Sequence, residues 1–458
     1  MGKVNGMARS YEMDMSEGPL FGKLLRFSIP LMFSGILQLL FNAADIVVVG
    51  RFAGQQSLAA VGSTSSFINL TINLFVGISL GVNAVVARHY GNRDMNAVTD
   101  TVHTAMLLSF ISGIFLALLG QVITRPLLEL MQSPDDVISL STLYLKIYFL
   151  GMPAFMAYNF ASSVLRAMGD TKRPLYFLLV AGIVNVCLNL VFVIGFNLDV
   201  MGVALATIIS QYISAILVLL TLMRLDGPCR FVFQKMRLHW VRVKEVLLIG
   251  LPSGVQGILF SISNVMIQSN INSFGSVVMA GNSASANIEG FVYTSMYAFS
   301  QTAVSFVGQN FGAGKRERIR RSIWMCVAMV TVVGLAMGIF LQFTSHFFLG
   351  IYTTEEDVIA IGMERLSVVC TTYFLCGIMD TLVGSLRGLG YAIVPMFISI
   401  LGICGLRILW MATVCVWYPE PMTLYLSYPV TWIITLSVDV ICLLYLYRKI
   451  FGKTKKEA

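Results

Sequence analysis

Long apolar runs, separated by short polar segments, follow one another along the whole chain. A transmembrane helix needs about 20 largely apolar residues, and each run is long enough for one. Apolar and polar residues do not alternate within the runs, which excludes the roughly ten-residue strands of a transmembrane β-barrel. The runs predict twelve helices, at 25–49, 58–86, 101–122, 140–160, 176–197, 203–223, 246–271, 278–304, 323–345, 358–384, 394–416 and 423–447.

The composition points to the same fold class. Hydrophobic residues make up 57% of the 458 residues, and charged residues only 12%. A soluble chain of this length folds into two or three domains with hydrated surfaces, and 12% charge cannot cover them. The excess of apolar residues must face lipid, so we predict an all-α polytopic membrane protein.

The basic residues give the orientation. Of the 31 Lys and Arg residues, 26 fall in segments on the side that holds both termini, Arg387 among them, and only Arg51 and Arg125 fall in loops on the other side. Cytoplasmic loops are enriched in Lys and Arg, so both termini are predicted to be cytoplasmic. The net charge of +8 is explained by the membrane, and no nucleic-acid partner is expected.

The two halves of the chain resemble each other. Matching positions keep a nearly constant offset, which slips by a single position between the early and the later matches. They include Pro30 and Pro252, Asn42 and Asn264, Gly91 and Gly312, and Arg166 and Arg387. Six helices duplicated in the same orientation predict two lobes, an arrangement that transporters use with the substrate site between the lobes.

This repeat divides the chain into five parts. They are a cytoplasmic N-terminal segment (1–20), an N-terminal six-helix lobe (21–223), a basic cytoplasmic linker (224–245), a C-terminal six-helix lobe (246–447) and a basic cytoplasmic tail (448–458).

Polar residues inside the apolar runs mark candidate sites, because ionisable groups in hydrocarbon are costly. Gln38, Asn42 and Asp45 share one face of the first helix, and Asn185 and Asn189 share one face of the fifth. A carboxylate among amides, with Thr207 on the sixth helix, can exchange a proton or a cation. The alternative is a structural or hydrated aspartate. The repeat places Ile267 at the position of Asp45, so the cluster is not duplicated.

A second set of polar residues is a candidate substrate cavity for a cationic compound. It consists of Glu289, Asp380, Asn159 and Asn282. Glu289 and Asp380 would neutralise the cation, but each could instead pair with an intramembrane base. Arg407 is available to Asp380 or Asp439, and for Asp439 we expect such a structural ion pair.

Few features indicate other chemistry. The eight cysteines lie almost all inside apolar runs without a Cys-x-x-Cys pair, and the four histidines show no metal-ligand spacing. No metal or cofactor is expected. The chain also lacks the nucleotide-binding glycine-rich loop that direct ATP drive requires.

Three segments together resemble the multidrug and toxic compound extrusion (MATE) transporters. They are Asp45-Ile46-Val47-Val48-Val49-Gly50-Arg51, Leu165-Arg166-Ala167-Met168-Gly169-Asp170-Thr171 and Val307-Gly308-Gln309-Asn310-Phe311-Gly312-Ala313-Gly314. The resemblance covers about residues 20–450 and is closer to the bacterial DinF-like branch than to the NorM branch. It implies two six-helix lobes that form a V with pseudo-two-fold symmetry and exchange a drug for H⁺ or Na⁺.

The resemblance also implies roles for individual residues. Asp45 occupies the position of the family's helix-1 carboxylate, and Asn185 and Thr207 match its partners. Asn189 departs from the pattern, because DinF-like members carry a second aspartate there. A single carboxylate favours H⁺ over Na⁺. The expected protein is a monomeric exporter of small amphipathic, cationic compounds in the bacterial cytoplasmic membrane.

Two other functions are open. A lipid-linked oligosaccharide or lipid II flippase of the same superfamily would carry several basic residues in its central cavity, where this chain offers Arg407 and, marginally, Lys146 and Arg365. A membrane enzyme would need paired carboxylates for Mg²⁺ or a His/Asp constellation. Because neither is evident, the protein is not expected to be an enzyme.

Overall fold

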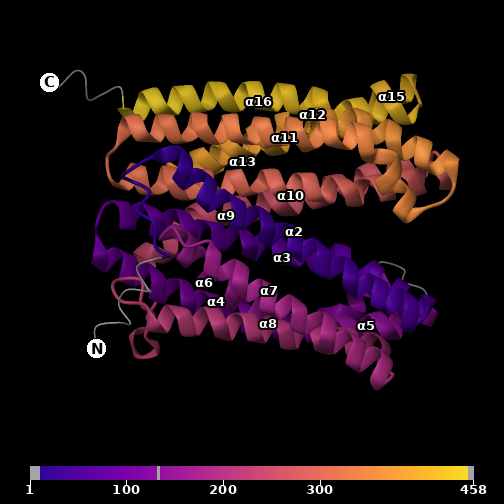
Figure 1. The fold of residues 1–458 in the computed structure, drawn as a ribbon, viewed down its shortest axis with the longest axis horizontal. Coiled ribbons are helices and arrows are strands. Elements are labelled where there is room, and N and C mark those ends of the chain that lie inside the picture. The colour runs from indigo at the N-terminus through magenta and orange to yellow at the C-terminus, as the bar shows by residue number, and fades with distance from the viewer. Residues whose placement is uncertain (1–10, 131–134, 452–458) are drawn as a thin grey trace. The chain divides into compact units, whose positions relative to one another are not determined.

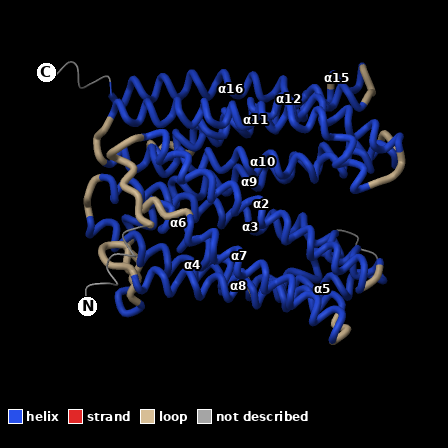
Figure 2. The backbone as a smooth tube through the Cα atoms, in the orientation of Figure 1, coloured by secondary structure: helices blue, strands red, loops and turns tan. Residues whose placement is uncertain are grey.

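All elements of the computed structural model are helices within the residues that it describes, 11–130 and 135–451 (Figure 2). Each of the twelve predicted runs is helical, which confirms the predicted fold class. The elements, shown in Figure 1, are α2 (Leu20–Phe52), α3 (Gln55–Gly91), α4 (Met95–Leu130), α5 (Asp135–Leu150), α6 (Met152–Ala167), α7 (Lys172–Asn189), η1 (Leu190–Gly195), α8 (Asp199–Arg224), η2 (Phe233–Lys235), α9 (Trp240–Asn272), α10 (Ser276–Gly312), α11 (Arg316–Tyr352), α12 (Glu356–Gly388), α13 (Ile393–Ser399), η3 (Ile400–Gly405), α14 (Leu406–Ala412), α15 (Val414–Trp417) and α16 (Pro421–Phe451).

Most of these helices can cross a membrane by length and apolarity. The described part of the chain has ten such spans, of which one combines α7 with η1 and another combines α13, η3, α14 and α15, and α5 with α6 adds an eleventh span that is bent by 45°. The bend lies at Gly151, and Pro153 removes a backbone donor just after it. One predicted span remains, 278–304, and it lies in α10. This helix is long enough, with 37 residues, but it is less apolar than the spans counted above.

The helices form two compact units, and their boundaries differ from those of the predicted lobes. Among the described residues, unit 1 comprises 11–14 and 33–254, and unit 2 comprises 15–32 and 255–451. The first part of α2 therefore belongs to unit 2, and the first part of α9 belongs to unit 1. The chain passes between the units two residues after Pro30 in α2 and two residues after Pro252 in α9.

Glycines bring α3 and α9 into close contact within unit 1. A Cβ atom on Gly77 would lie 2.2 Å from the backbone nitrogen of Gly254, and one on Gly81 would lie 2.4 Å from the carbonyl oxygen of Val246. Gly250 and Gly254 meet α3 just as closely. The two Gly-x-x-x-Gly pairs thus let the backbones approach, which is how membrane helices gain van der Waals contact.

Unit 2 is built around α12. This helix packs along α10, α11 and α16 (Figure 1). An apolar cluster at one end of these helices contains Val307, Ile323 and Leu386, and a second cluster contains Val369, Met379 and Trp432. The long central helix therefore carries apolar contacts to three neighbours as well as the polar residues described below.

The predicted repeat is visible in the backbone. Residues with positive φ occur in three pairs at loop positions that end or begin helices, and all three pairs share the offset of the later sequence matches. The pairs are Gly54 (86°) and Gly275 (98°), Arg93 (57°) and Gly314 (69°), and Gly169 (94°) and Gly390 (91°). The same turns therefore recur in both halves. Among these residues only Arg93 adopts the conformation with a side chain, which costs about 1 kcal/mol.

The Leu165–Thr171 motif anchors the N-terminal segment in unit 1. The backbone N–H of Met13 donates to the carbonyl of Met168 at 3.1 Å, and a Cβ on Gly169 would lie 2.5 Å from the carbonyl oxygen of Met13. Asp170 accepts the N–H groups of Lys172 and Arg173 at the start of α7. Burial raises the pKa of Asp170 to about 6, against the opposing effect of these bonds and of the Arg173 guanidinium.

The Val307–Gly314 motif anchors the next residues in unit 2. The N–H of Met15 donates to the Gln309 Oε1 atom at 3.0 Å, and Asn310 Nδ2 donates to the carbonyl of Met15 at 3.2 Å. Arg318 donates to the carbonyls of Met15, Glu17 and Gly18. Both motifs therefore have a structural role, which is to hold consecutive pieces of residues 11–18.

The glycine contact makes a stability prediction. Gly254→Ala should lower the free energy of unfolding by about 1–3 kcal/mol, because the new Cβ would overlap the backbone of α3. The thermal unfolding midpoint of the purified protein measures this loss. Gly62→Ala is the control, because its Cβ would meet nothing within 4 Å. Equal midpoints for the two variants would contradict the close contact.

The orientation predicts a labelling pattern. A cysteine at the exposed Gln234 of η2 should resist an impermeant maleimide added to intact cells and should react after permeabilisation, because the basic linker is expected inside. Glu420→Cys, in the exposed segment between α15 and α16, should react without permeabilisation. The reverse pattern would overturn the orientation.

Candidate functional site

A chain of polar side chains in unit 1 links three helices. Asn189 Nδ2 donates to the Asp45 carboxylate at 2.5 Å and lies 3.3 Å from Asn185 Oδ1. Asn185 Nδ2 in turn lies 3.5 Å from Thr207 Oγ1, which donates to the carbonyl of Val203. The structure thus brings Asp45 of α2, Asn185 and Asn189 of α7 and Thr207 of α8 into one connected group.

The other two predicted members of this site lie outside the group. Gln38 and Asn42 have side chains on α2 that take no part in it. Sequence reasoning missed Tyr144 and Tyr148 of α5, which interact electrostatically with Asp45. Their signal was weak, since two tyrosines at i and i+4 on an apolar helix usually pack against neighbours.

The carboxylate of Asp45 faces neutral partners. Among the residues that the structure describes, no basic group lies within 4 Å of it. Asn189 is fully buried, and its Oδ1 atom has no hydrogen-bond partner within the described residues. The site therefore offers an acid and an unused amide oxygen, both of which can bind a proton donor or a small cation.

The backbone changes at this site. α7 ends at Asn189, and the π-helical segment η1 (Leu190–Gly195) follows without a break. Single π-helical turns inside α-helices are frequent at functional sites, and a second such segment, η3, occurs in unit 2. The position equivalent to Asp45 in the repeat is Ile267, which is buried in an apolar cluster with Ile271 and Leu424. Among the described residues, this polar group thus lies in unit 1 and has no counterpart at the repeat-equivalent position of Asp45.

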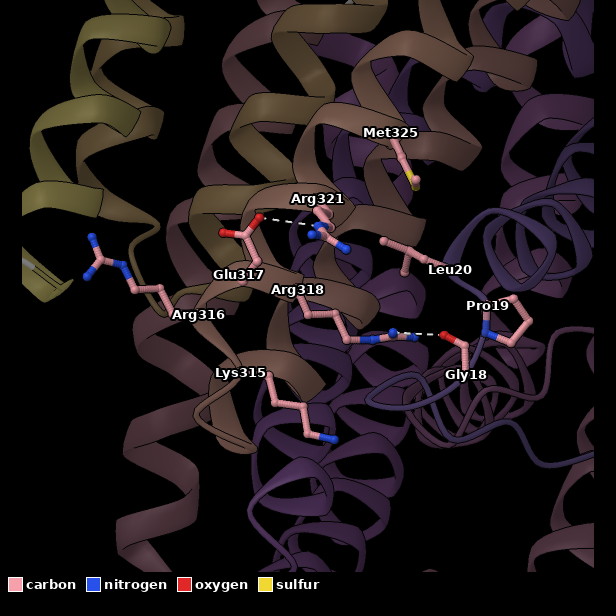
Figure 3. Close-up of a pocket in the computed structure, with 9 residues that line it drawn as sticks. All are labelled: Gly18, Pro19, Leu20, Lys315, Arg316, Glu317, Arg318, Arg321 and Met325. Carbon is pink, nitrogen blue, oxygen red and sulfur yellow. Dashed lines mark hydrogen bonds and ion pairs between the residues drawn. The ribbon is translucent and has the colours of Figure 1, made fainter.

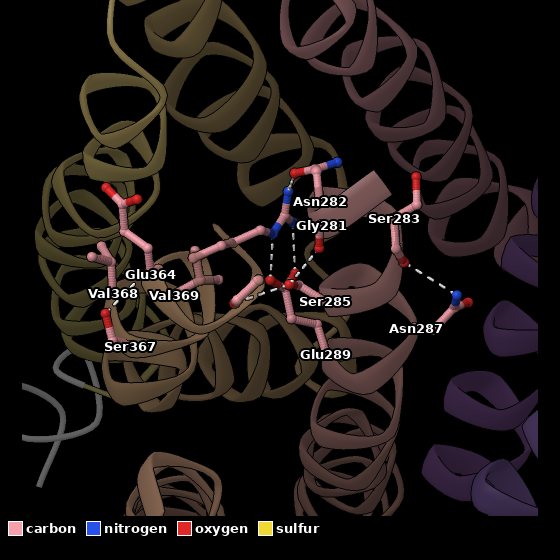
Figure 4. Close-up of polar contacts among 12 residues, drawn as sticks. Gly281, Asn282, Ser283, Ser285, Asn287, Glu289, Glu364, Ser367, Val368 and Val369 are labelled. Atoms are coloured by element: carbon pink, nitrogen blue, oxygen red, sulfur yellow. Dashed lines mark hydrogen bonds and ion pairs between the residues drawn. The ribbon is translucent and has the colours of Figure 1, made fainter. Parts of the chain in front are cut away.

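In unit 2, Glu289 of α10, labelled in Figure 4 beside Asn282 and Ser285, forms an ion pair with Arg365 of α12. Arg365 Nε donates to Glu289 Oε1 at 2.6 Å, and its Nη2 atom donates to Oε2 at 2.8 Å. The Nη1 atom donates to the side-chain oxygen of Asn282. Both charged residues are buried, at 4% and 6% exposure. The pair is bidentate, the strongest geometry for arginine and a carboxylate.

Further polar and aromatic groups surround this pair. Asn282 Nδ2 donates to Gln268 Oε1 at 3.0 Å, which extends the network to α9. The rings of Tyr425 and Tyr428 on α16 lie 5.8 and 5.5 Å from the guanidinium carbon of Arg365. The predicted cavity residues Glu289 and Asn282 do lie together, but both already bind Arg365. The charge of Glu289 is therefore neutralised within the protein.

A second acidic cluster lies elsewhere in unit 2. Asp380 and Arg387 of α12 and Asp439 of α16 interact electrostatically, and Arg387 Nη2 donates to Gln256 Oε1 at 2.8 Å. Asp439 is fully buried, and neither of its carboxylate oxygens has a hydrogen-bond partner among the described residues. Arg387, which we expected in a cytoplasmic segment, is buried at 6% exposure inside α12.

The expected pairing of Arg407 is wrong. Its guanidinium carbon lies 4.1 Å from the centroid of the Tyr428 ring, and its Nε atom donates to Thr431 Oγ1 at 3.3 Å. Within the described residues, neither Asp380 nor Asp439 has a basic group within 4 Å. An arginine can satisfy its charge on an aromatic face, and sequence pattern alone gave no sign of that choice.

Asn159, the remaining predicted cavity residue, lies in unit 1. Its Nδ2 atom donates to the carbonyl of Phe155 on its own helix, α6, at 2.9 Å. The structure thus joins Asn282 with Glu289 and places Asp380 in a different cluster. Sequence reasoning treated Arg365 as marginal, although an arginine inside an apolar run requires an acceptor.

Comparison with known proteins bears on the whole chain. The MatE family model matches residues 30–191 and again residues 252–413. The two matches begin at Pro30 and Pro252, the prolines that the repeat pairs. Together they cover well over half of the chain.

Several relatives and solved structures are similar along most of their length. "Probable multidrug resistance protein YoeA" from Bacillus subtilis is 27% identical over 83% of this chain and 84% of that protein. The "FAD transporter" of Shewanella oneidensis is 24% identical over 74% of this chain and 76% of that protein. A solved MOP superfamily transporter from Pyrococcus furiosus has a TM-score of 0.89 at 19% identity, over 94% of this chain and 97% of that one.

The structural likeness supports the fold, and the double match to one family model agrees with the repeat in the sequence and in the backbone turns. The expectation that the protein is not an enzyme agrees with relatives that are described as transporters and resistance proteins. The chain belongs to the MatE family.

Proposed function

We propose that this protein is a secondary active transporter that exports small amphipathic, cationic compounds in exchange for H⁺, by alternating access. It would act as a monomer in the bacterial cytoplasmic membrane with both termini inside. Family membership and the names of the relatives support export. The coupling ion and the charge of the substrate are our inference from the polar groups of the two units.

The observation that carries the proposal is the connected group around Asp45. An exchanger needs a site that binds a cation in one state and releases it in another. Asp45 has only neutral partners among the described residues, so its occupancy can change without breaking an ion pair. The amide chain through Asn189 and Asn185 can reorient when the carboxylate gains or loses its partner.

The donor set favours H⁺ over Na⁺. Asn189 supplies an amide where DinF-like members carry a second aspartate, so the group has one carboxylate. Metal cations are held by several oxygen ligands, and the amide at Asn189 replaces a charged ligand with a neutral one. A single proton needs only one carboxylate. We therefore assign the proton as the coupling ion.

The acids of unit 2 support a cationic substrate. Asp380 and Asp439 outnumber Arg387 in their cluster, so it carries a formal excess of one negative charge, whereas Glu289 is already neutralised by Arg365. The flippase alternative is not favoured, because the relatives described above are named as a multidrug resistance protein and a transporter of FAD. Arg365, one of the two marginal basic candidates for a flippase, is bound to Glu289.

The first prediction concerns coupling. Asp45→Asn keeps the size of the side chain and removes its titrating charge. The variant should insert and bind substrate but lose transport driven by a proton gradient. The exchange of a singly charged cation for H⁺ moves no net charge, and a gradient of one pH unit contributes about 1.4 kcal/mol per proton, so the sustained substrate gradient should fall by up to about tenfold per pH unit. Dye uptake into inverted vesicles, with proton and sodium gradients imposed separately, measures this.

The control for coupling is Asp199→Asn. It makes the same chemical change in unit 1 at an exposed position, where φ is 44° and asparagine is tolerated. Ile267→Asn would be a poor control, although the repeat suggests it, because it would place an amide in an apolar cluster. Undiminished proton-driven transport by Asp45→Asn would refute the assignment of Asp45 as the coupling residue. Transport driven by a sodium gradient alone would refute the assignment of H⁺ as the coupling ion.

The second prediction separates the two acids of unit 2. Asp380→Asn should lower the efflux of cationic dyes severalfold more than that of neutral compounds. Glu289→Gln should lower both equally and reduce the amount of folded protein, because breaking a buried ion pair costs about 3–5 kcal/mol. Efflux assays and membrane abundance measure the difference. Equal effects of Asp380→Asn on cationic and neutral compounds would contradict a cation site there.

A further inference from the structure

A basic pocket of about 630 Å³ lies at the start of two membrane helices in unit 2 (Figure 3). One wall is the segment that leads into α2, and the other is the first part of α11. The residues that line it are Gly18, Pro19, Leu20, Lys315, Arg316, Glu317, Arg318, Arg321 and Met325. None of them belongs to the groups around Asp45, Glu289 or Asp380.

The pocket has an excess of positive charge. Figure 3 shows Lys315, Arg318 and Arg321 on the side that faces Gly18, whereas Arg316 points away, toward the rings of Tyr447 and Phe451. These three cations face two acids, because Lys315 Nζ lies 3.4 Å from Glu17 Oε1 and Arg321 Nε lies 3.2 Å from Glu317 Oε1. Three cations and two acids leave a formal excess of one positive charge. Lys315 and Arg318 also donate to backbone carbonyls of residues 15–18, which orients their side chains.

The N-terminal ends of two helices add to the positive electrostatic potential of the pocket. Leu20 begins α2, whose first turn has no acidic residue, and Arg316 begins α11, whose first turn carries Glu317. The N-terminal ends of both helices thus border one pocket, and helix N-termini favour anions. The side chain of Arg321 can reorient toward a ligand most easily. It pairs with Glu317 on its own helix at 3.2 Å, and both side chains are more than half exposed.

The position and lining of the pocket match a bilayer surface. α2 and α11 are both long and apolar enough to span a membrane, so their common start lies near a membrane–water interface. Trp324, next to the lining residue Met325, is 57% exposed, as expected for a tryptophan at headgroup level. Leu20 and Met325 give the pocket an apolar side beside its basic side.

We propose that this pocket binds the phosphate headgroup of an anionic phospholipid. Lys315, Arg318 and Arg321 contact the phosphate, and Leu20 and Met325 contact the first carbons of the lipid. A free phosphate would gain nothing from the apolar side, which is why the lipid is the better ligand. This site is independent of the proposed transport function.

Native mass spectrometry of the purified full chain tests the proposal. Phosphatidylglycerol and phosphatidylcholine with identical acyl chains are titrated separately in detergent, and inorganic phosphate is added as competitor. We expect preferential binding of phosphatidylglycerol. Arg321→Gln should weaken this binding about fivefold, which corresponds to the contribution of one basic side chain at an anionic surface.

Arg320→Gln is the matched control. Arg320 is on the same helix, is paired with the same Glu317 and is exposed to a similar extent, at 62% for its side chain against 67% for Arg321, but it does not line the pocket. It should keep the full lipid preference. Equal losses in the two variants would show general surface attraction and overturn the pocket. Displacement of the lipid by an equal concentration of inorganic phosphate, or equal binding of the two lipids, would overturn the lipid assignment.

Discussion

A charge that is placed in hydrocarbon must find compensation inside the protein, and this constraint organises the polar residues of both units. Water is absent there, so an isolated ion is costly. Arg365 meets the constraint with Glu289, through two short hydrogen bonds on a bidentate face. The guanidinium of Arg407 is instead stabilised by the face of the Tyr428 ring. In both cases the compensation is permanent, so these residues hold α10, α12, α14 and α16 together.

Asp45 has no basic group within 4 Å among the described residues, as is also true of Asp380 and Asp439. Unlike that of Asp439, however, its carboxylate accepts a hydrogen bond from a connected chain of neutral side chains, which makes it the candidate for coupling. Its partners are the neutral amides of α7 and, through them, a hydroxyl of α8. None of these supplies a compensating charge. The compensation must therefore come from a proton or a cation that arrives and leaves. A site that is complete without a mobile ion could not couple transport to a gradient.

The sequence predicted the features that depend on local pattern. The twelve helices follow from apolar run length, and the repeat follows from an offset that the paired turns at Gly169 and Gly390 reproduce. Asn185 and Asn189, which share one helix face, do join Asp45. Gln38 and Asn42, by contrast, share the helix face of Asp45 but lie outside the group. Partners across helices were not predictable in the same way. Nothing in the spacing of Glu289, Arg365 and Arg407 indicates which arginine reaches the acid and which reaches a ring.

The repeat also explains why one scaffold has two unlike interiors. The turns and the proline-containing helices α2 and α9 recur in both halves because they define the path of the backbone. The side chains inside each unit are under no such requirement. Asp45 has become Ile267 in the second half, within an apolar cluster, while unit 2 has gained its own ion pair at Glu289 and Arg365. The two halves thus share the course of the backbone, whereas their buried polar residues differ.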